Sequence, residues 1–546
     1  MFRYIETHRS CNSLIKISGR LKRGRMKKLL LYTIVAATLA SCSTRSGHLE
    51  GVYGRTPYHP EVPLGMIYIP SGGFTMGQND GDVPFLHQTR AKTVSVQAFY
   101  MDQTEISNNE YRQFVNWVRD SIAREKIYIG LEEDEDASRW IDYSEYYFSE
   151  GDLEYVEFEE SDRYINRENF SLNWDRRFYY GDPELVPLLA DMYYPQPERF
   201  YKRREFDTRK LVFTYYWIDY VEAAKRGRIN ITPNAFDKDG VKLVPEHREL
   251  DTPPHPFTEE PQGQDLNLSQ GVPGEGSINK KGQSNAIRGH ANRQRFIIDE
   301  KINVYPDTLC WVRDFTYSFH DPMTNMYFWH PAYDNYPVVG VTWTQAKAFS
   351  IWRTQLLNTW LVEMGDLFVN DFRLPTEAEW ERASRGDLEL SQYPWGGPYI
   401  RNESGCFLGN FKPMRGRYFE DGGFHSVKVY SYNPNGWGLY CMAGNVSEWC
   451  ETAFDESMYE FSHDLNTDYR YNAMDWDPPS MKRKVLRGGS WKDIGYYLRN
   501  STRTFEYQDT AKSYIGYRNV MTHLGRGGRD FTKEGGEEIR SDIQLR

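Results

Sequence analysis

The stretch "RLPTEAEWERASR", residues 373–385, predicts where a helix begins. Thr376 and Glu379 have the spacing of a capping box, in which a hydroxyl and a carboxylate satisfy free N–H groups at the start of a helix. Pro375 stands immediately before this pair, where an interruption of the backbone hydrogen bonding is tolerated. The stretch therefore predicts a helix that opens directly after Thr376.

Two further capping boxes lie outside this stretch, Ser107 with Glu110 and Thr342 with Gln345. Apolar residues with helical spacing follow each of them, which is the pattern of a helix that buries one face. We therefore expect helices to start after Ser107 and after Thr342.

Short strand-like pieces lie between the expected helices, and turns rich in Gly, Asn and Pro separate them. The clearest pieces cover residues 66–70, 94–101 and 427–432. Few helices, short strands and many turns together predict an α+β fold with much ordered loop.

The composition sets the size of the fold and excludes one class of function. A chain of 546 residues is long enough for several domains, or for one domain with a large insertion. Aromatic residues make up 15% of it, so large rings with polar tips are available to hold irregular segments in place. The net charge of −11 argues against a general nucleic-acid-binding protein, because phosphate neutralisation needs a basic face.

The N-terminal segment has the pattern of an export signal. Lys27 and Lys28 precede the apolar run 29–39, which has the length of a secretory signal core and is too short to span a bilayer. The run ends in "LASC", which resembles a bacterial lipobox and implies acylation of Cys42. An ordinary signal peptide followed by a buried cysteine is the alternative. We expect residues 1–41 to be a signal peptide, with Met26 a candidate start, and residues 42–62 to be a tether that hangs the protein from a membrane.

Cys310, Cys406, Cys441 and Cys450 are not spaced like a zinc ligand set. In an oxidising compartment they allow one or two disulfides, and the sequence leaves the pairing open. Free buried thiols are the other interpretation.

The middle of the chain, residues 119–330, differs from both ends and is predicted to be an insertion. Residues 130–164 hold fourteen acidic residues and two arginines among aromatic residues. Such a run is either a solvated face or an interaction surface. Residues 253–295 are rich in Pro, Gly, Gln and Asn and predict a mobile loop, and residues 522–546 form a polar tail.

Five segments in order resemble the formylglycine-generating-enzyme, or sulfatase-modifying factor, family. The resemblance covers residues 63–118 and 331–521 and implies a compact, loop-rich α+β fold related in outline to C-type lectin-like domains. "RLPTEAEWE" and "GNVSEW" are its most distinctive parts. The segments are "MIYIPSGGFTMG" (66–77), "FYMDQTEISNNEYRQFV" (99–115), "YPVVGVTWTQAKAFSIW" (336–352), "FRLPTEAEWERASRG" (372–386) and "GLYCMAGNVSEW…LRGGSW…IGYR" (438–518).

The resemblance also implies that the family's chemistry is missing. The oxidases of the family hold copper(I) with two cysteines placed shortly after "GGS", and a soft ion of this kind needs thiolates. Aligned on "RGGSW", those positions are Asp493 and Leu498. We expect a pseudoenzyme without a required cofactor. An unrelated activity around Asp493 and Lys492 is the alternative, and a turn carboxylate is the plainer interpretation of Asp493.

Structural calcium is the one ion that the resemblance suggests. One site would use Asn410, the Phe411 carbonyl and Asp421. The other would use the carbonyls of Gly444 and Val446 with the Glu448 carboxylate. Oxygen ligands suit this hard ion, although Cys441 occupies a position where the second site needs an oxygen. Hydrogen bonds that hold the loops are the alternative role of these residues.

Within the family the chain resembles the gliding-motility lipoprotein K proteins of Bacteroidota, through nearly all of its length. The resemblance implies a non-catalytic part of the type IX secretion and gliding machinery. In that role the protein lies on the periplasmic face of the outer membrane, carries acyl lipid on Cys42 and forms a ring with a GldN/PorN-like partner. The alternatives are a gliding lipoprotein J-like component and a cell-wall or glycan-binding module.

Overall fold

The computed structural model describes residues 62–77, 91–130, 141–143, 170–172, 174, 177–218, 297–314, 321–365, 368–414, 419–473 and 477–524. The expected signal peptide, Cys42 and most of the tether lie outside the described residues, as do most of the acidic run and the segment 253–295. Within the described part, no helix has the length and apolar character needed to cross a bilayer.

The first sheet joins the two ends of the body. Its four strands have the order β1–β4–β14–β9, and all the pairs are antiparallel. Because β14 lies between β4 and β9, the C-terminal part of the body completes a sheet that the N-terminal part begins. The strands are β1 (Met66–Ile69), β4 (Phe99–Asp102), β14 (Val520–Thr522) and β9 (Phe372–Arg373).

The second sheet carries the two motifs that most resemble the family. Its order is β12–β11–β10–β13, with β13 parallel to β10 and the other pairs antiparallel. Strand β10 contains the end of "GNVSEW", and β11 ends where "RGGSW" begins, so the motifs lie side by side with Glu448 opposite Arg487. The strands are β10 (Ser447–Ala453), β11 (Arg483–Arg487), β12 (Thr504–Tyr507) and β13 (Ile515–Gly516).

The three predicted helix starts are confirmed. Helix α10 (Trp343–Met364) begins after Thr342 and α11 (Glu377–Arg385) after Thr376, and each has a complete capping box. Helix α2 (Asn108–Gly130) begins after Ser107, whose N–H and hydroxyl both donate to Glu110 Oε2 at 2.7 Å. A cap of this kind contributes about 1 kcal/mol, and the buried apolar face of each long helix contributes more.

Two of the three expected strand pieces need correction. Residues 94–101 are not one strand but contain the end of β3 (Lys92–Val96) and most of β4, because the chain passes from one sheet to another at residues 97–98. Strand β3 pairs with β2 (Gly72–Met76). Residues 427–432 form no strand. There the Val427 N–H donates to Asn445 Oδ1 and the Val429 N–H to a carbonyl, so loops take the hydrogen bonds that a strand neighbour would receive.

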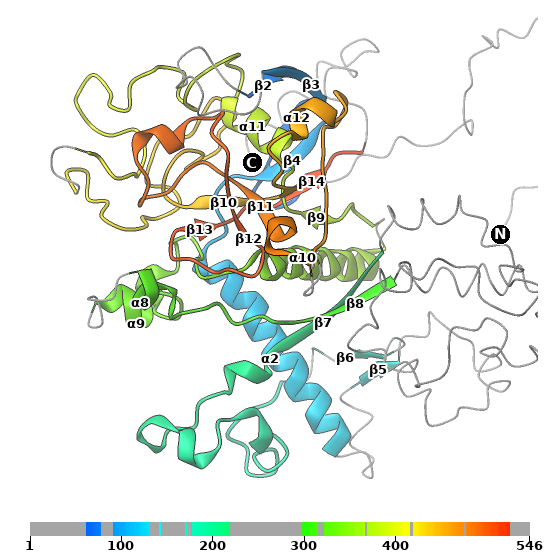
Figure 1. The fold of residues 1–546 in the computed structure, drawn as a ribbon. Coiled ribbons are helices and arrows are strands. Elements are labelled where there is room, and N and C mark those ends of the chain that lie inside the picture. Colours follow the sequence, from blue (N-terminus) through cyan, green and yellow to red (C-terminus); the bar gives the residue numbers. More distant parts are fainter. Residues whose placement is uncertain are drawn as a thin grey trace, which may run out of the picture. The chain divides into compact units, whose positions relative to one another are not determined.

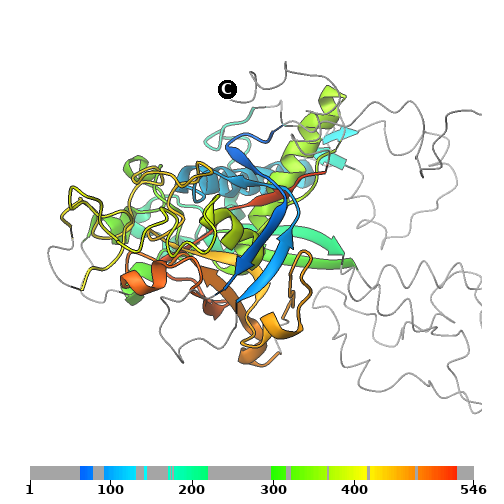
Figure 2. The ribbon, with the colours of Figure 1, turned by 90° about the horizontal axis from the view of Figure 1, so that it is seen from above.

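Helices α2 and α10 cross beside the second sheet, as both views show (Figure 1, Figure 2). Their aromatic faces meet in one cluster, in which Tyr111 stacks on Phe349 and Phe114 packs against Trp352. The hairpin of β7 (Val212–Ile218) and β8 (Ile297–Asn303) adds Phe213 to this cluster. Part of the predicted insertion therefore belongs to the main hydrophobic core.

The remaining elements are short. A second hairpin pairs β5 (Ile141–Tyr143) with β6 (Phe170–Leu172). Three one-turn helices lie in the loops of the body, α8 (Cys310–Asp314), α9 (Pro322–Met326) and α12 (Met458–Phe461). The 3₁₀ turns are Ala190–Met192, Gln196–Glu198, Phe200–Lys202, Thr208–Lys210, Pro331–Tyr333, Pro479–Lys482 and Gly495–Leu498.

Candidate functional site

The charged residues of the family-like motifs form a buried ion network. Arg487 Nη2 donates to Glu377 Oε1 at 2.5 Å and to Glu381 Oε2 at 2.8 Å, and all three side chains are fully buried. Arg503 Nε reaches the same Glu377 oxygen at 2.6 Å, and Arg385 pairs with Glu381 at 2.7 Å. Burial raises the pKa of Glu377, and the guanidiniums of Arg503 and Arg487 more than offset that effect, so its pKa lies below the ordinary range.

A second buried pair lies under strand β10. Arg518 donates to both oxygens of Glu448, from Nη2 at 2.6 Å and from Nε at 2.7 Å, and Trp380 Nε1 donates to the second of these oxygens at 2.7 Å. Glu105 lies nearby and accepts the Val446 N–H at 3.1 Å. Burial and the Glu448 charge raise the pKa of Glu105 well above its usual value. The charged motif residues therefore bind mainly one another, while Glu377 Oε2 and Arg487 Nε are buried without a hydrogen-bond partner in the part of the chain that the structure describes.

Asp493 acts as the turn carboxylate that its sequence position suggests. Its Oδ2 accepts the Ser490 hydroxyl at 2.6 Å and the Ser490 N–H at 3.0 Å, which closes the turn after β11. Burial raises the pKa of this carboxyl group. The neighbouring Lys492 turns away to the Tyr514 ring, with Nζ 4.4 Å from the ring centre. Asp493 therefore contacts Ser490 and Lys492 contacts Tyr514.

Leu498, at the second position where the resemblance implies a cysteine, is a buried apolar residue. It is 1% exposed and belongs to an apolar cluster with four other buried side chains. The Gly489 backbone approaches it so closely that a β-carbon there would lie 3.2 Å from Leu498 Cδ1. The other members of the cluster are Tyr393, Phe407, Phe411 and Ala443. This position is a packing site.

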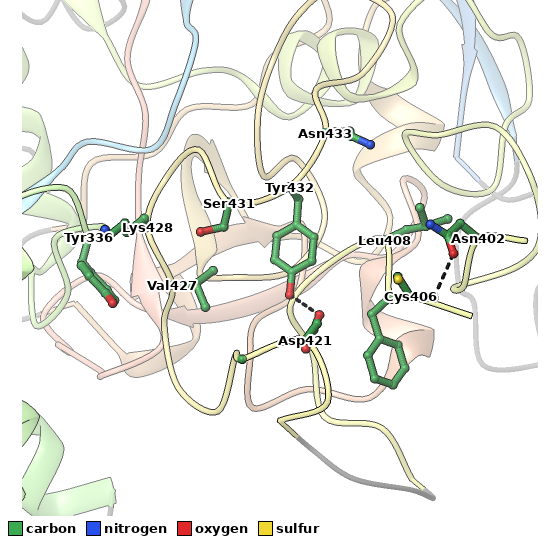
Figure 3. Close-up of a pocket in the computed structure, with 12 residues that line it drawn as sticks. Tyr336, Asn402, Cys406, Leu408, Asp421, Val427, Lys428, Ser431, Tyr432 and Asn433 are labelled. Carbon is green, nitrogen blue, oxygen red and sulfur yellow. Dashed lines mark hydrogen bonds between the residues drawn. The ribbon is translucent and has the colours of Figure 1, made fainter. Parts of the chain in front are cut away.

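A cavity of about 400 Å³ lies on the outer side of this region. Tyr432 and Asp421 stand between the 402–408 loop and the 427–431 segment (Figure 3), and the Tyr432 hydroxyl donates to Asp421 Oδ2 at 2.7 Å. Burial and the Asp421 carboxylate raise the pKa of Tyr432 above its usual value, so this hydroxyl stays protonated. No sequence pattern predicted this cavity, because its walls come from irregular loops. Its lining residues are Tyr336, Asn402, Cys406, Phe407, Leu408, Asp421, Gly422, Val427, Lys428, Ser431, Tyr432 and Asn433.

The residues proposed for the first calcium site serve separate contacts. Asn410 is buried; its Nδ2 donates to the His425 carbonyl at 2.7 Å, and its own carbonyl accepts the Asn445 N–H at 2.9 Å. The Phe411 ring packs in the cluster around Leu498, and Asp421 is exposed at the cavity. These contacts match the alternative role in which hydrogen bonds hold the loops.

The second proposed calcium site meets a competing charge. Gly444 and Val446 lie beside Asn410 and Glu105 respectively, and Glu448 is already paired with Arg518. A calcium ion would have to compete with a buried guanidinium for this carboxylate. Among the described residues no group of three or more His, Cys, Asp or Glu side chains is arranged to hold a metal ion. Calcium binding stays a prediction.

Cys310, Cys406, Cys441 and Cys450 are free thiols, so of the two interpretations the structure favours unpaired cysteines. Three of them are buried, and Cys406 is exposed at the cavity. Burial raises the pKa of Cys310 to about 12 and that of Cys441 and Cys450 well above their usual value. The buried thiols therefore stay protonated and are poor nucleophiles.

Lys484 is a buried cation that the sequence did not mark. It is 0% exposed on β11, its Nζ lies 3.8 Å from the centre of the Trp343 ring, and it donates to the Tyr471 carbonyl. Burial, together with the nearby Lys347 charge, lowers its pKa to about 7. Strand β11 reads "RKVLR" and does not alternate polar and apolar residues, so its sequence contains no signal that Lys484 is buried.

Comparison with known proteins gives one family. The family described as sulfatase-modifying factor enzyme 1-like domain matches residues 56–159 and 294–523, which is more than half of the chain. The inactive C-alpha-formylglycine-generating enzyme 2 of Bos taurus is 34% identical over 190 residues, which cover 34% of this chain and 49% of that protein. The formylglycine-generating enzyme of Streptomyces coelicolor is 33% identical over 190 residues, 34% of this chain and 52% of that protein.

These similarities have a limited extent. The chain spans about half the length of these two relatives. Among solved structures, PvdO from Pseudomonas aeruginosa aligns with 84% of this chain and 94% of its own, at 12% sequence identity and a TM-score of 0.36. The relatives include both an active and an inactive enzyme by name, so activity has to be argued from the residues of this chain.

Proposed function

Because the chain belongs to the sulfatase-modifying factor enzyme 1-like family, we propose that it uses this fold as a non-catalytic structural part of a membrane-anchored assembly. The assembly is the type IX secretion and gliding machinery, and the chain is its lipoprotein K-type (GldK/PorK) component. Acyl chains on Cys42 hold it at the periplasmic face of the outer membrane. There it forms a ring with a GldN/PorN-like partner.

The packing around Leu498 is the main support for a non-catalytic role. A copper(I) site needs two thiolates that can approach one ion. At one position a leucine lies buried among aromatic rings, and at the other Asp493 is bound to Ser490. The buried Cys441 and Cys450 keep their protons. The relative from Bos taurus that is described as inactive offers a parallel within the family.

Exposed aromatic side chains support a role in assembly. Tyr179, Tyr399 and Phe424 are 75%, 76% and 60% exposed, far more than a ring buried in its own core. Large rings are the usual anchors of protein interfaces, because they bury much surface and lose little conformational entropy. A ring additionally needs two different faces on each copy that bind head to tail.

Purification from outer membranes in a mild detergent tests this proposal. We expect the full-length chain to elute as a very large complex with a second, soluble protein, and electron microscopy to show closed rings. A Cys42→Ala variant should leave the membrane fraction, because it lacks the acyl anchor. A monodisperse monomer without a partner would refute the proposal.

The residual-enzyme alternative has its own test. Asp493→Ala should leave secretion and ring formation intact, since the lost carboxylate only closes the turn at Ser490. Deletion of the acidic run 130–164 serves as the contrasting variant and should abolish secretion. Loss of secretion in Asp493→Ala protein that still folds and assembles would bring the enzymatic alternative back.

The cavity at Tyr432 favours a second candidate, a glycan-binding module. Amides, hydroxyls, a carboxylate and an amine converge there beside a tyrosine, and such groups suit a sugar with many hydroxyls. Sedimentation with purified cell wall tests it, with Asn402→Ala/Asn433→Ala as the cavity variant. Retention that this variant abolishes would favour the glycan-binding module, and no retention of the wild type would eliminate it. A lipoprotein J-like component shares the fold, and the identity of the co-purified partner separates it from the K type.

A further inference from the structure

A basic, aromatic tip projects from the insertion at residues 200–204, and we call Phe200, Tyr201, Lys202, Arg203 and Arg204 the basic tip. Phe200 and Tyr201 are 69% and 82% exposed, and their rings pack edge to face with the centres 4.5 Å apart. Tyr201 and Lys202 have φ values of 48° and 57°, a left-handed conformation that side chains other than glycine rarely adopt. Two large aromatic rings are therefore exposed to water beside a backbone turn of unusual conformation.

The cations of the basic tip are available for binding. Lys202 and Arg203 are exposed, and neither side chain has an ion pair or hydrogen bond within the described part of the chain. Arg204 is an exposed residue, and its guanidinium carbon lies 4.2 Å from the centre of the Tyr193 ring. Glu205 is the exposed acidic neighbour of these three cations. The tip thus presents a net positive charge on a chain of net charge −11.

Neighbouring cations are already used in holding the tip in place. Arg199 Nε donates to the Tyr194 carbonyl at 2.7 Å, and Arg209 pairs with Glu198 and Asp207. Apolar contacts also pack the lobe that carries the tip, residues 177–210, against the C-terminal half of α2. The basic tip therefore belongs to a segment that is packed against the body. The buried members of this contact are Ala123, Ile127, Leu185, Leu189, Met192 and Tyr193.

The chain contains a segment of complementary character. Residues 130–164 carry fourteen acidic residues and two arginines, a net charge of −12, whereas the whole chain has a net charge of −11, so the rest of the chain is close to neutral. Like the basic tip, it combines charged residues with aromatic ones. Strand β5 begins within this run, at Ile141–Tyr143, and pairs with β6.

We propose that the basic tip of one copy binds the acidic aromatic run 130–164 of the next copy. This inference rests on the ring described under the proposed function and names the contact that builds it. Because the two partners are different segments of the chain, the contact is head to tail, which is the kind that generates rings. Opposite charges steer the copies together and fix their register, and the exposed rings supply the apolar part of the contact.

Site-specific cross-linking in the full-length protein tests the proposal. Two differently tagged copies are co-expressed, and only the first carries the photoreactive p-benzoylphenylalanine in place of Tyr201. After irradiation of the purified complex we expect an adduct between the copies that survives denaturation. Mass spectrometry should place the cross-link within residues 130–164 of the second copy.

Charge reversal adds a specific readout. Lys202→Glu/Arg203→Glu in the first copy should lower the adduct yield about fivefold or more, and Glu132→Lys/Glu133→Lys in the second copy should restore it. The matched control, Lys301→Glu/Lys412→Glu, makes the same charge change at two exposed lysines away from the tip and should leave the yield unchanged. The adduct should also decrease as salt is raised, because exposed charges are screened.

The outcomes separate this inference from the ring itself. If the complex stays very large but the probe reacts within its own copy, with phospholipid or with another protein, the inference is overturned and the ring stands. The same holds if the charge reversal changes nothing. If the preparation contains only monomers, the proposed function fails first, and the contact fails with it.

Discussion

Neutralising Glu377 tests whether the charged motif residues are structural. Glu377→Gln keeps the shape of the side chain and removes its charge. Arg487 would then keep only Glu381, which Arg385 also uses, and Arg503 would lose its carboxylate partner. Arg487 is fully buried and Arg503 nearly so, so water does not replace the lost anion.

The expected loss follows from this burial. Breaking a buried ion pair by removing one partner costs about 3–5 kcal/mol, because the other charge remains desolvated. Here one carboxylate serves two guanidiniums, which places the loss toward the upper part of that range. An exposed pair contributes about 0–1 kcal/mol, so the two cases are easily distinguished.

Urea unfolding of the purified full-length protein, followed by tryptophan fluorescence, measures the free energy of unfolding. Glu460→Gln is the matched control, since Glu460 is exposed on α12, and it should lie within about 0.5 kcal/mol of wild type. A loss of less than about 1 kcal/mol for Glu377→Gln would refute the reasoning.

Acid gives a second readout of the same carboxylate. The pKa of Glu377 in the folded protein lies below its ordinary value of 4.5. Its ionised form therefore stabilises the fold above that pH, and this contribution is lost as the pH falls through the lower, folded pKa. The difference between wild type and Glu377→Gln should shrink in the same range. A difference that stays constant down to full acid unfolding would contradict the assignment.

Two further predictions concern single buried residues. Leu498→Ala should lower the free energy of unfolding by about 2–5 kcal/mol, because it leaves a cavity under the Phe407 and Phe411 rings; a loss below about 1 kcal/mol would mean that the site is not packed as described. Lys484 has an ordinary pKa of 10.5 and a pKa of about 7 in the folded protein. Between these two pH values the unfolded chain binds more protons than the folded protein. The stability of wild type relative to Lys484→Met should therefore rise with pH in this range, by up to about 1.4 kcal/mol per pH unit. Melting temperatures of both proteins at pH 6.5 and pH 9.5 measure this, and a difference independent of pH would mean that Lys484 keeps its proton.

The sequence predicted the helix starts because the relevant interactions are local. Thr376 and Glu379 are three residues apart, and their capping box needs no tertiary contact. It failed at residues 427–432, where Val427 has the composition of a strand residue but donates its N–H to Asn445. A strand needs a partner strand, and the chain supplies a loop instead.

What the sequence determined by itself was the family-like framework and the residue types at the two positions where the resemblance implies cysteines. Motif spacing is local, and the identity of Asp493 and Leu498 is read directly. Only the tertiary structure decided what these residues do. Arg487 meets Glu377 across 110 positions of the chain, and Leu498 meets Phe407 across 91, because two sheets and a helix bring distant loops together. These contacts form between residues far apart in the sequence and are buried in the fold. The pattern of neighbouring residues therefore does not reveal which residues form ion pairs or pack together.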